Sequence, residues 1–183
     1  DLVLTRYQQL GYTNDALRAL QSGLIPVMRS FSGLEVVAIK DAQPENFRLG
    51  EDVCAMDWET VRPGPIVIDQ ANLFAFMRAK EKKKRWSDEQ DVDEMQKYLE
   101  KFSQYRGKKL RQQRSVYERG YYNAVLLRAL QWNPTLRERN RVEPLEASVD
   151  YAHVALERLR QKHAVFYDAY KKEYAALEQR MML

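Results

Sequence analysis

EASVDYAHVALERLRQKHAVFYDAYKKEYAALEQRMML, residues 146–183, carries a continuous pattern of apolar residues. Its packing residues recur at spacings of three and four, as Val149, Ala152, Leu156, Leu159, His163, Phe166, Tyr170, Tyr174, Leu177 and Met181. This period keeps side chains on one face of an α-helix. We therefore expect a helix from about Glu146 to the last residue, roughly 50 Å long at about 1.5 Å per residue. Because a core of this size buries only part of such a helix, we expect the rest to pack on another chain.

The segments before this helix also carry helical signals. SDEQ (87–90) is a capping box, in which Ser87 caps the helix that begins at the next residue. The apolar pattern lapses around Gly107, resumes at Val116 and is expected to stop at Asn133-Pro134. Residues 134–145 then form a connector. The two long C-terminal helical segments predict an antiparallel hairpin.

Shorter helices are expected at the N-terminal end. One spans residues 2–10, and a second is capped by Thr13 or Asn14 and runs to about Ser22. Gly23 stands where a helix C-terminal glycine belongs. Pro26 suits the first turn of a third helix that continues through Phe31.

A change of composition at Gly33 predicts a small insertion. LEVVAIK (34–40) and PIVID (65–69) read as strands, and Asp69 is expected to cap a helix that begins at Gln70. We expect a mainly α fold: a helical body, a long C-terminal helical hairpin, and a small β or irregular insertion at about 33–69. The chain is expected to form a single domain, with residues 1–145 as the body and 146–183 as the amphipathic helix that packs on the body, a partner or both.

Composition narrows the class of protein. Of 183 residues, 45% are hydrophobic, which is enough for a core, and Cys54 is the single cysteine. One cysteine excludes an internal disulfide, which fits a reducing intracellular compartment, and we expect Cys54 to be a small buried residue. No run reaches the roughly 18 apolar residues of a membrane span. The chain starts at Asp1, so a cleaved targeting peptide or a boundary within a longer chain is expected; with a pI of 9.1, the mitochondrial matrix side is one expected location.

Charge is unevenly distributed along the chain. Residues 34–69 hold eight acidic and three basic residues, whereas residues 70–145 hold eighteen basic and ten acidic residues. Basic residues beside aromatic rings are typical of RNA-binding surfaces, because phosphates attract cations and bases stack on rings. The candidates for an anionic partner or RNA are Lys82, Lys83, Lys84, Arg85, Lys108, Lys109, Arg111 and Arg114.

Catalytic signals are weak in this sequence. It has no glycine-rich phosphate loop and no nucleophile elbow. His153 and His163 are ten residues apart on one expected helix, about 15 Å, too far to hold one metal ion, and His163 is expected to be a polar member of a packing seam. Acids between Glu51 and Glu59 could in principle bind a divalent cation. We expect no catalytic residue, no cofactor and no metal ligand.

Tyrosine is the unusual component of the C-terminal helix. Tyrosine combines a large apolar ring with a polar hydroxyl and is enriched in the cores of protein interfaces. Tyr170 belongs to the stripe and is expected to face the core, whereas Tyr167 lies beside the stripe and is the better interface candidate. The expected partner-binding residues are Tyr151, Phe166, Tyr167, Tyr170 and Tyr174.

The preferred functional hypothesis is a non-catalytic scaffold subunit of a larger intracellular complex, with respiratory and ATP-synthase-like assemblies among those open. Other protein subunits would bind through the C-terminal helix. The first alternative is an RNA-binding component of a ribonucleoprotein, such as an organellar ribosome, acting through the basic region 78–114. The second alternative is a metal-dependent enzyme that uses the acids of residues 51–59.

Overall fold

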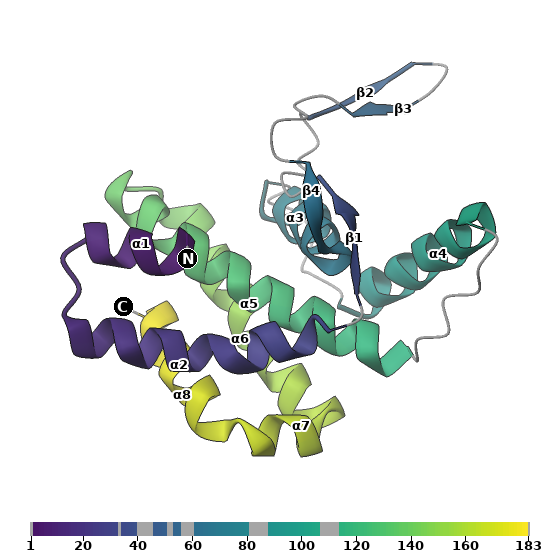
Figure 1. The fold of residues 1–183 in the computed structure, drawn as a ribbon. Coiled ribbons are helices and arrows are strands. Elements are labelled where there is room, and N and C mark those ends of the chain that lie inside the picture. The colour runs from purple at the N-terminus through teal and green to yellow at the C-terminus, as the bar shows by residue number, and fades with distance from the viewer. Residues whose placement is uncertain are drawn as a thin grey trace.

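The computed structural model describes residues 2–32, 34–39, 46–50, 53–55, 61–80, 88–106 and 114–182. Over these ranges the fold is mainly α, as the sequence predicts, with a small β-containing region between two helical parts (Figure 1). The elements in chain order are α1 (Leu2–Gln9), α2 (Asn14–Ser30), β1 (Glu35–Ala38), β2 (Phe47–Leu49), β3 (Val53–Ala55), β4 (Arg62–Pro65), α3 (Ile66–Lys80), α4 (Asp88–Arg106), α5 (Arg114–Glu138), α6 (Val142–Lys162), α7 (Ala164–Ala169) and α8 (Lys171–Met182).

Helix α5 is the centre of the helical body, with α1, α2, α3, α6 and α8 packed around it (Figure 1). Every residue from Gly120 to Leu126 is buried. Seven residues make about two full turns, so this part of α5 is covered on all sides. Gly120 permits the closest contact, because a Cβ atom there would lie 2.5 Å from the Leu34 side chain.

Helix α2 is one continuous helix, and this corrects the expected break at Gly23. Thr13 caps it as predicted, since its hydroxyl oxygen accepts a hydrogen bond from the Ala16 amide at 3.3 Å. Gly23 and Pro26 are both buried inside the helix. Gly23 serves a close contact with α8 instead of a turn: a Cβ atom there would meet Leu177 at 2.7 Å. Packing against α8 and α5 therefore overrides the local preference of these two residues.

The hairpin of α5 and α6 is present as predicted, but the turn between them lies elsewhere. Helix α5 continues past Asn133 and Pro134, which are both buried, and ends at Glu138. The chain reverses at residues 139–141, where Asn140 adopts a left-handed conformation with φ of 53°. The expected connector over 134–145 is therefore wrong, because α6 already begins at Val142.

The single C-terminal helix expected from the stripe is also wrong. The chain bends at His163 and again at Tyr170, each with φ near −130°, which divides the segment into α6, α7 and α8. These bends turn the chain back so that α8 packs against α2, which it crosses in Figure 1. Tyr174, Leu177 and Met181 are thereby buried in the chain's own core. The stripe of apolar residues is real, but it covers one folded body instead of a straight 50 Å rod.

The β-containing region differs from the expected strands in detail. β1 forms as predicted and pairs with β4 in antiparallel register, from Glu35 opposite Pro65 to Ala38 opposite Arg62. Of the expected strand at 65–69, only Pro65 lies in β4, and the rest is the first turn of α3, which begins at Ile66. Asp69 is therefore no helix cap; its carboxylate accepts a hydrogen bond from the Ile39 amide at 2.8 Å and ties the end of β1 to α3.

A second antiparallel pair, β2 with β3, was not predicted. It projects away from the helical body in Figure 1. Cys54 lies in β3 and is exposed, so its expected burial is wrong. A ribbon of two three-residue strands that projects from the body offers little surface to cover a side chain.

Helix α4 begins at Asp88, as the capping box predicts, while Ser87 itself lies outside the described residues. No helix in the described part of the chain is long and apolar enough to cross a lipid bilayer.

Candidate functional site

Two of the tyrosines predicted to bind a partner lie inside the protein. Tyr174 is 0% exposed and Tyr167 is 5% exposed. Their rings stack in parallel, with centroids 5.0 Å apart and planes 4° apart. The expectation that Tyr167 faces outward is thus corrected: the bend at His163 rotates α7 relative to α6, and it carries Tyr167 into the core.

The hydroxyl group of Tyr174 is part of a buried polar chain. It donates to the Asn123 side-chain oxygen at 2.9 Å, and the Asn123 amide donates to the Arg119 carbonyl at 3.0 Å. Burial raises the pKa of Tyr174 well above its usual value, an effect that outweighs the hydrogen bond to Asn123. This tyrosine is neutral at physiological pH and acts as a structural hydrogen-bond donor.

The other three predicted partner-binding residues, Tyr151, Phe166 and Tyr170, are partly exposed at the edge of the core. The rings of Phe166 and Tyr170 lie 5.1 Å apart and are tilted by 52°. The Arg119 guanidinium covers the Phe166 ring at 4.5 Å from its centroid. These three rings keep part of their surface available, so partner binding by this set stays a prediction.

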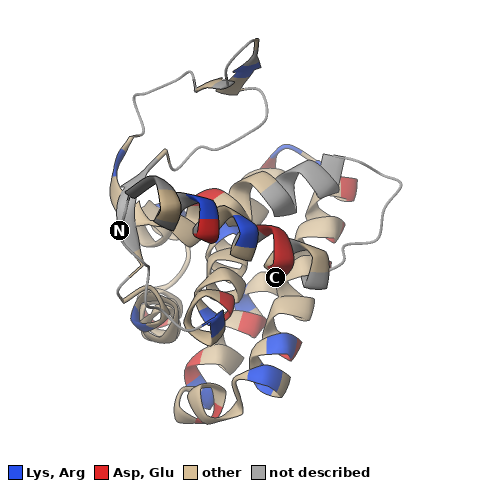
Figure 2. Cartoon of the chain, turned by 90° about the vertical axis from the view of Figure 1, so that its right-hand side faces the viewer, with Lys and Arg blue, Asp and Glu red and all other residues tan. Residues whose placement is uncertain are grey.

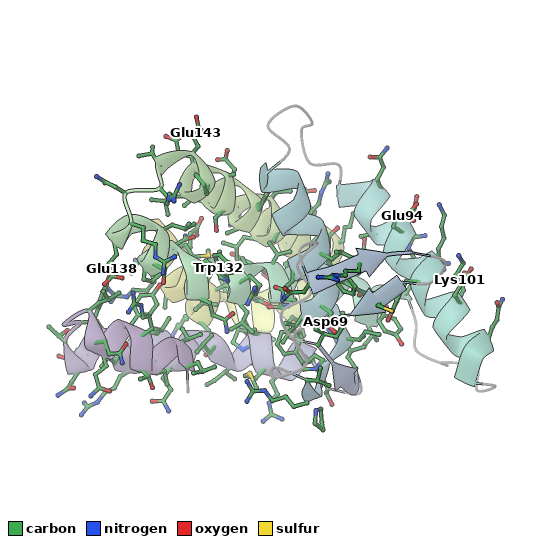
Figure 3. The ribbon with its side chains drawn as sticks, turned by 90° about the horizontal axis from the view of Figure 1, so that it is seen from above. Asp69, Glu94, Lys101, Trp132, Glu138 and Glu143 are labelled. Carbon is green, nitrogen blue, oxygen red and sulfur yellow. The ribbon has the colours of Figure 1, made fainter. Side chains whose placement is uncertain are left out.

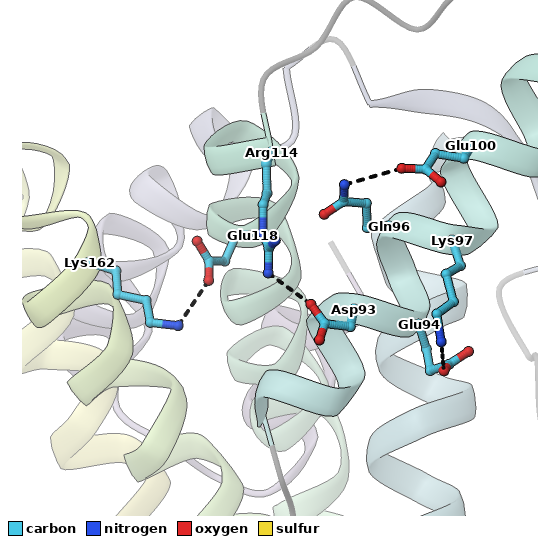
Figure 4. A network of polar contacts seen from close by, with 8 residues as sticks. All are labelled: Asp93, Glu94, Gln96, Lys97, Glu100, Arg114, Glu118 and Lys162. Carbon is cyan, nitrogen blue, oxygen red and sulfur yellow. Dashed lines mark hydrogen bonds and ion pairs between the residues drawn. The ribbon is translucent and has the colours of Figure 1, made fainter.

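Most of the predicted anion-binding residues fall outside the described part of the chain. This holds for Lys82, Lys83, Lys84, Arg85, Lys108, Lys109 and Arg111. Arg114 is described: it lies in the first turn of α5 and donates to the Asp93 carboxylate of α4 at 3.0 Å (Figure 4). Arg114 therefore has an acidic partner within the chain, in an ion pair whose two side chains are more than half exposed. RNA binding through this region stays a prediction that the described residues do not test.

A second ion pair continues from Arg114 toward α6. One turn further along α5, Glu118 accepts a hydrogen bond from the Lys162 ammonium at 3.1 Å (Figure 4). His163 places its Nε2 atom 3.6 Å from the other carboxylate oxygen, and its side chain is only 7% exposed. His163 and Lys162 lower the pKa of the Glu118 carboxyl to about 2 against the opposing effect of burial.

These contacts give the Glu118 cluster a structural role. The bend at His163 ends α6, and Glu118 holds the two residues on either side of that end. The prediction that His163 is a polar member of a packing seam is confirmed. His153 lies elsewhere, 3.8 Å from Glu178 of α8, so the two histidines are engaged separately.

The α5–α6 turn lies at the end of the molecule away from α4. In Figure 3, Glu138 and Glu143 mark this turn, and Glu94 and Lys101 mark α4. Here Arg6 of α1 pairs with Glu138. Arg137 and Asn133 donate to the Met181 carbonyl at 3.2 and 3.4 Å. Arg137 and Asn133 therefore satisfy a carbonyl at the C-terminal end of α8, where the helix dipole favours a cation.

No group of three or more His, Cys, Asp and Glu side chains that could hold a metal ion occurs among the described residues. The acids proposed for a divalent cation, Glu51, Asp52, Asp57 and Glu59, lie outside those residues. The metal-enzyme alternative therefore rests on the sequence pattern alone. Basic and acidic segments alternate along the helices in Figure 2, so the view shows no face of a single charge.

The outward face of α2 is the surface that sequence reasoning missed. Met28 is 63% exposed and Ile25 is 43% exposed, and they are one turn apart. Large apolar side chains exposed together on one face mark interaction surfaces more often than isolated ones do. The sequence held a signal, since Arg18, Ile25 and Arg29 share one line of a helix, but the expected break at Gly23 separated them.

Another exposed apolar side chain, Val165, lies on α7 and is 89% exposed. Its neighbours in the chain are Ala164, which is exposed, and Phe166, which is partly buried. An isolated exposed valine needs no functional explanation. It provides a control position for tests of the α2 face.

Comparison with known proteins gives no relative: the chain matches no family model, and neither a curated protein sequence nor a solved structure is significantly similar to it.

Proposed function

We propose that the protein is a non-catalytic structural subunit whose helical body binds another protein within a larger intracellular assembly. The observation that carries this proposal is the outward face of α2, where Ile25 and Met28 lie exposed on a helix whose other face packs against α8 and α5. Exposing two large apolar side chains side by side costs solvation free energy, which a partner would recover by covering them.

The interior of the body supports the same role. The polar side chains Asn123, Glu118 and Asn133 are each bonded to groups of a neighbouring helix or of their own, in networks that hold the helices together. Hydrogen bonds between helices favour one arrangement of those helices. A rigid body with an uncovered apolar face suits a subunit that positions others.

The compartment is part of the proposal. A single cysteine and a pI of 9.1 suit a reducing intracellular compartment, with the mitochondrial matrix side as one candidate. Respiratory and ATP-synthase-like complexes are assemblies of the proposed kind.

The test is to tag the chain in the cells that express it and to separate a gentle extract by size. We expect the chain to migrate with a particle much larger than its own 21.6 kDa. Partners should co-purify in fixed stoichiometry and survive nuclease treatment, because the contacts are between proteins. Migration as a free monomer would contradict the proposal, and loss of the large particle after nuclease would favour the RNA-binding alternative.

A further inference from the structure

We infer that the outward face of α2 binds an acidic amphipathic helix of a partner protein; the inference rests on the proposed subunit role. The face is formed by the exposed residues of α2 between Arg18 and Arg29, which are Arg18, Gln21, Ser22, Ile25, Met28 and Arg29. We call this set the α2 face.

The charges on the α2 face favour a partner surface of negative charge. At 100° per residue, Arg18, Ile25 and Arg29 lie within about 40° of one line along the helix. The two arginines are eleven residues apart, which is roughly 16 Å at about 1.5 Å per residue. An apolar side chain between two cations is complementary to a helix with an apolar stripe and carboxylates about three turns apart.

Both cations are available to a partner. Arg18 lies 3.9 Å from Asp15, but the two side chains are 81% and 94% exposed, so this pair is loose and solvated. Arg29 has no ion-pair partner among the residues that the structure describes. Asp15 is the only acidic residue in α2. The α2 face therefore presents uncompensated positive charge at its C-terminal end.

A helix fits the α2 face better than an extended segment does. Ile25 and Met28 are spaced by three, which is the spacing at which side chains of one helix form a ridge for the groove of another. The β-edge that an extended peptide would need is absent from α2. Partner helices that pack in this way place apolar residues three or four apart against the ridge and charged residues at its flanks.

Two other occupants suit this face less well. A second copy of the chain would bring Arg18 and Arg29 against the same two cations, and like charges across an interface cost binding free energy. Nucleic acid would meet only two cations with aliphatic side chains between them, and these offer no ring on which a base can stack. The acidic helix satisfies both the apolar and the cationic parts of the face.

The first experiment locates the occupant directly. A photo-crosslinking amino acid replaces Met28 in the full chain, expressed in its native cells, and the adduct is mapped by mass spectrometry. We expect the crosslink in a protein segment with apolar residues at helical spacing and a net negative charge. A crosslink to a basic segment, to RNA or to a second copy of this chain would overturn the inference.

The second experiment compares matched variants in the size separation described above. Ile25→Gln with Met28→Gln removes the apolar part of the α2 face, and Arg18→Glu with Arg29→Glu reverses its charge. Both pairs lie at exposed positions, so thermal melting should show a folded protein. Each pair should shift most of the chain from the large particle to the monomer. Val165→Gln on α7 is the control and should migrate as the wild type does.

The outcomes separate this inference from the proposed function. A wild-type chain in a large particle with both α2 pairs still bound would overturn the inference and leave the subunit role intact. A wild-type chain that migrates as a monomer would overturn the subunit role itself. The crosslinked segment, made as a synthetic peptide, should bind the wild-type chain about tenfold or more tightly than the Ile25→Gln, Met28→Gln variant, because centrally placed interface residues carry most of the binding free energy.

Discussion

Helices α2 and α5 carry the same unusual residues and end up in opposite environments. Each contains a buried glycine at which a leucine from elsewhere in the chain packs: Leu177 against Gly23 of α2, and Leu34 against Gly120 of α5. Each also contains a buried proline, Pro26 or Pro134. Yet α5 is covered on all sides over two turns, whereas α2 leaves a complete face in solvent.

This difference distinguishes the residues of α5 that stabilise the fold from the exposed residues of α2 that can bind another molecule. In α5 the apolar and polar side chains alike are engaged by neighbouring helices, as Tyr121, Asn123 and Leu126 illustrate. In α2 the residues toward α8, α5 and α1 are engaged, and the α2 face is exposed. Substitutions in α5 should therefore change stability, whereas substitutions on the α2 face should change association and leave stability nearly unaltered.

The largest expected contrast compares a buried leucine of α5 with the exposed methionine of α2. Leu126→Ala should lower the free energy of unfolding by about 3 kcal/mol or more, because Leu126 is fully buried and its removal leaves a cavity. Met28→Ala should change it by less than about 0.5 kcal/mol. Urea unfolding followed by circular dichroism measures both values. Equal losses would show that the α2 face is buried in the folded protein.

The next contrast concerns acidic residues and pH. The pKa of Glu118 in α5 is lowered from 4.5 to about 2 by His163 and Lys162. A lowered folded-state pKa contributes stability that is present above pH 4.5 and is lost as the pH falls toward 2. The upper limit of this loss is about 3 kcal/mol, at about 1.4 kcal/mol for each unit of pKa shift, and solvent around the partly exposed Lys162 reduces it. Unfolding measured between pH 6 and pH 2 should show this loss.

The matched variants sharpen the pH prediction. Glu118→Gln should remove most of the acid-dependent loss and lower stability at neutral pH. Asp15→Asn in α2 should lower the free energy of unfolding at neutral pH by at most about 1 kcal/mol, since that carboxylate is exposed and near a helix N-terminus. A Glu118→Gln protein with the wild-type pH profile would show that the cluster at His163 does not hold the end of α6.

The third contrast compares the two glycines. A Cβ atom at Gly23 would meet the Leu177 side chain at 2.7 and 2.8 Å and the Glu173 carbonyl oxygen at 3.1 Å. At Gly120 the only close atom is the flexible end of Leu34 at 2.5 Å, and the next lie at 3.5 Å. Gly23→Ala should therefore cost about 2 kcal/mol, and Gly120→Ala about 1 kcal/mol or less. The reverse order, in thermal or urea unfolding, would mean that α5 is packed more tightly than α2.

The sequence predicted the fold class and several elements because local patterns determine them. The Thr13 cap, β1, the start of α4 and the helical hairpin follow from capping chemistry and from the period of apolar residues. Gly23 and Pro134 were misread as helix ends, because their local preference is overcome by burial against other helices. That burial depends on residues more than forty positions away, which no local rule contains.

The candidate site was harder to predict than the fold. The C-terminal stripe reports which side chains face a core, but not that the chain bends at His163 and Tyr170 to form that core with α2. Tyr167 and Tyr174 were accordingly assigned to a partner, although they stack on each other inside the protein. The α2 face became visible only when α2 proved to be continuous, because its two arginines lie on either side of Gly23.

The smallest expected effect concerns the first turn of α5, where the helix leaves the buried core. Arg114, in its first turn, pairs with Asp93 of α4 at 3.0 Å, and both side chains are more than half exposed. A double-mutant cycle with Arg114→Ala and Asp93→Ala should give a coupling energy of about 0.5 kcal/mol, which salt should reduce, as for other exposed pairs. The Asp15–Arg18 pair of α2, longer at 3.9 Å, should give less. A coupling above about 2 kcal/mol at Arg114 would show that α4 is locked to α5 by a desolvated ion pair, and that the core extends into the first turn of α5. A small coupling energy would show that the first turn of α5 is exposed surface, like the α2 face, and that its residues can contact other molecules.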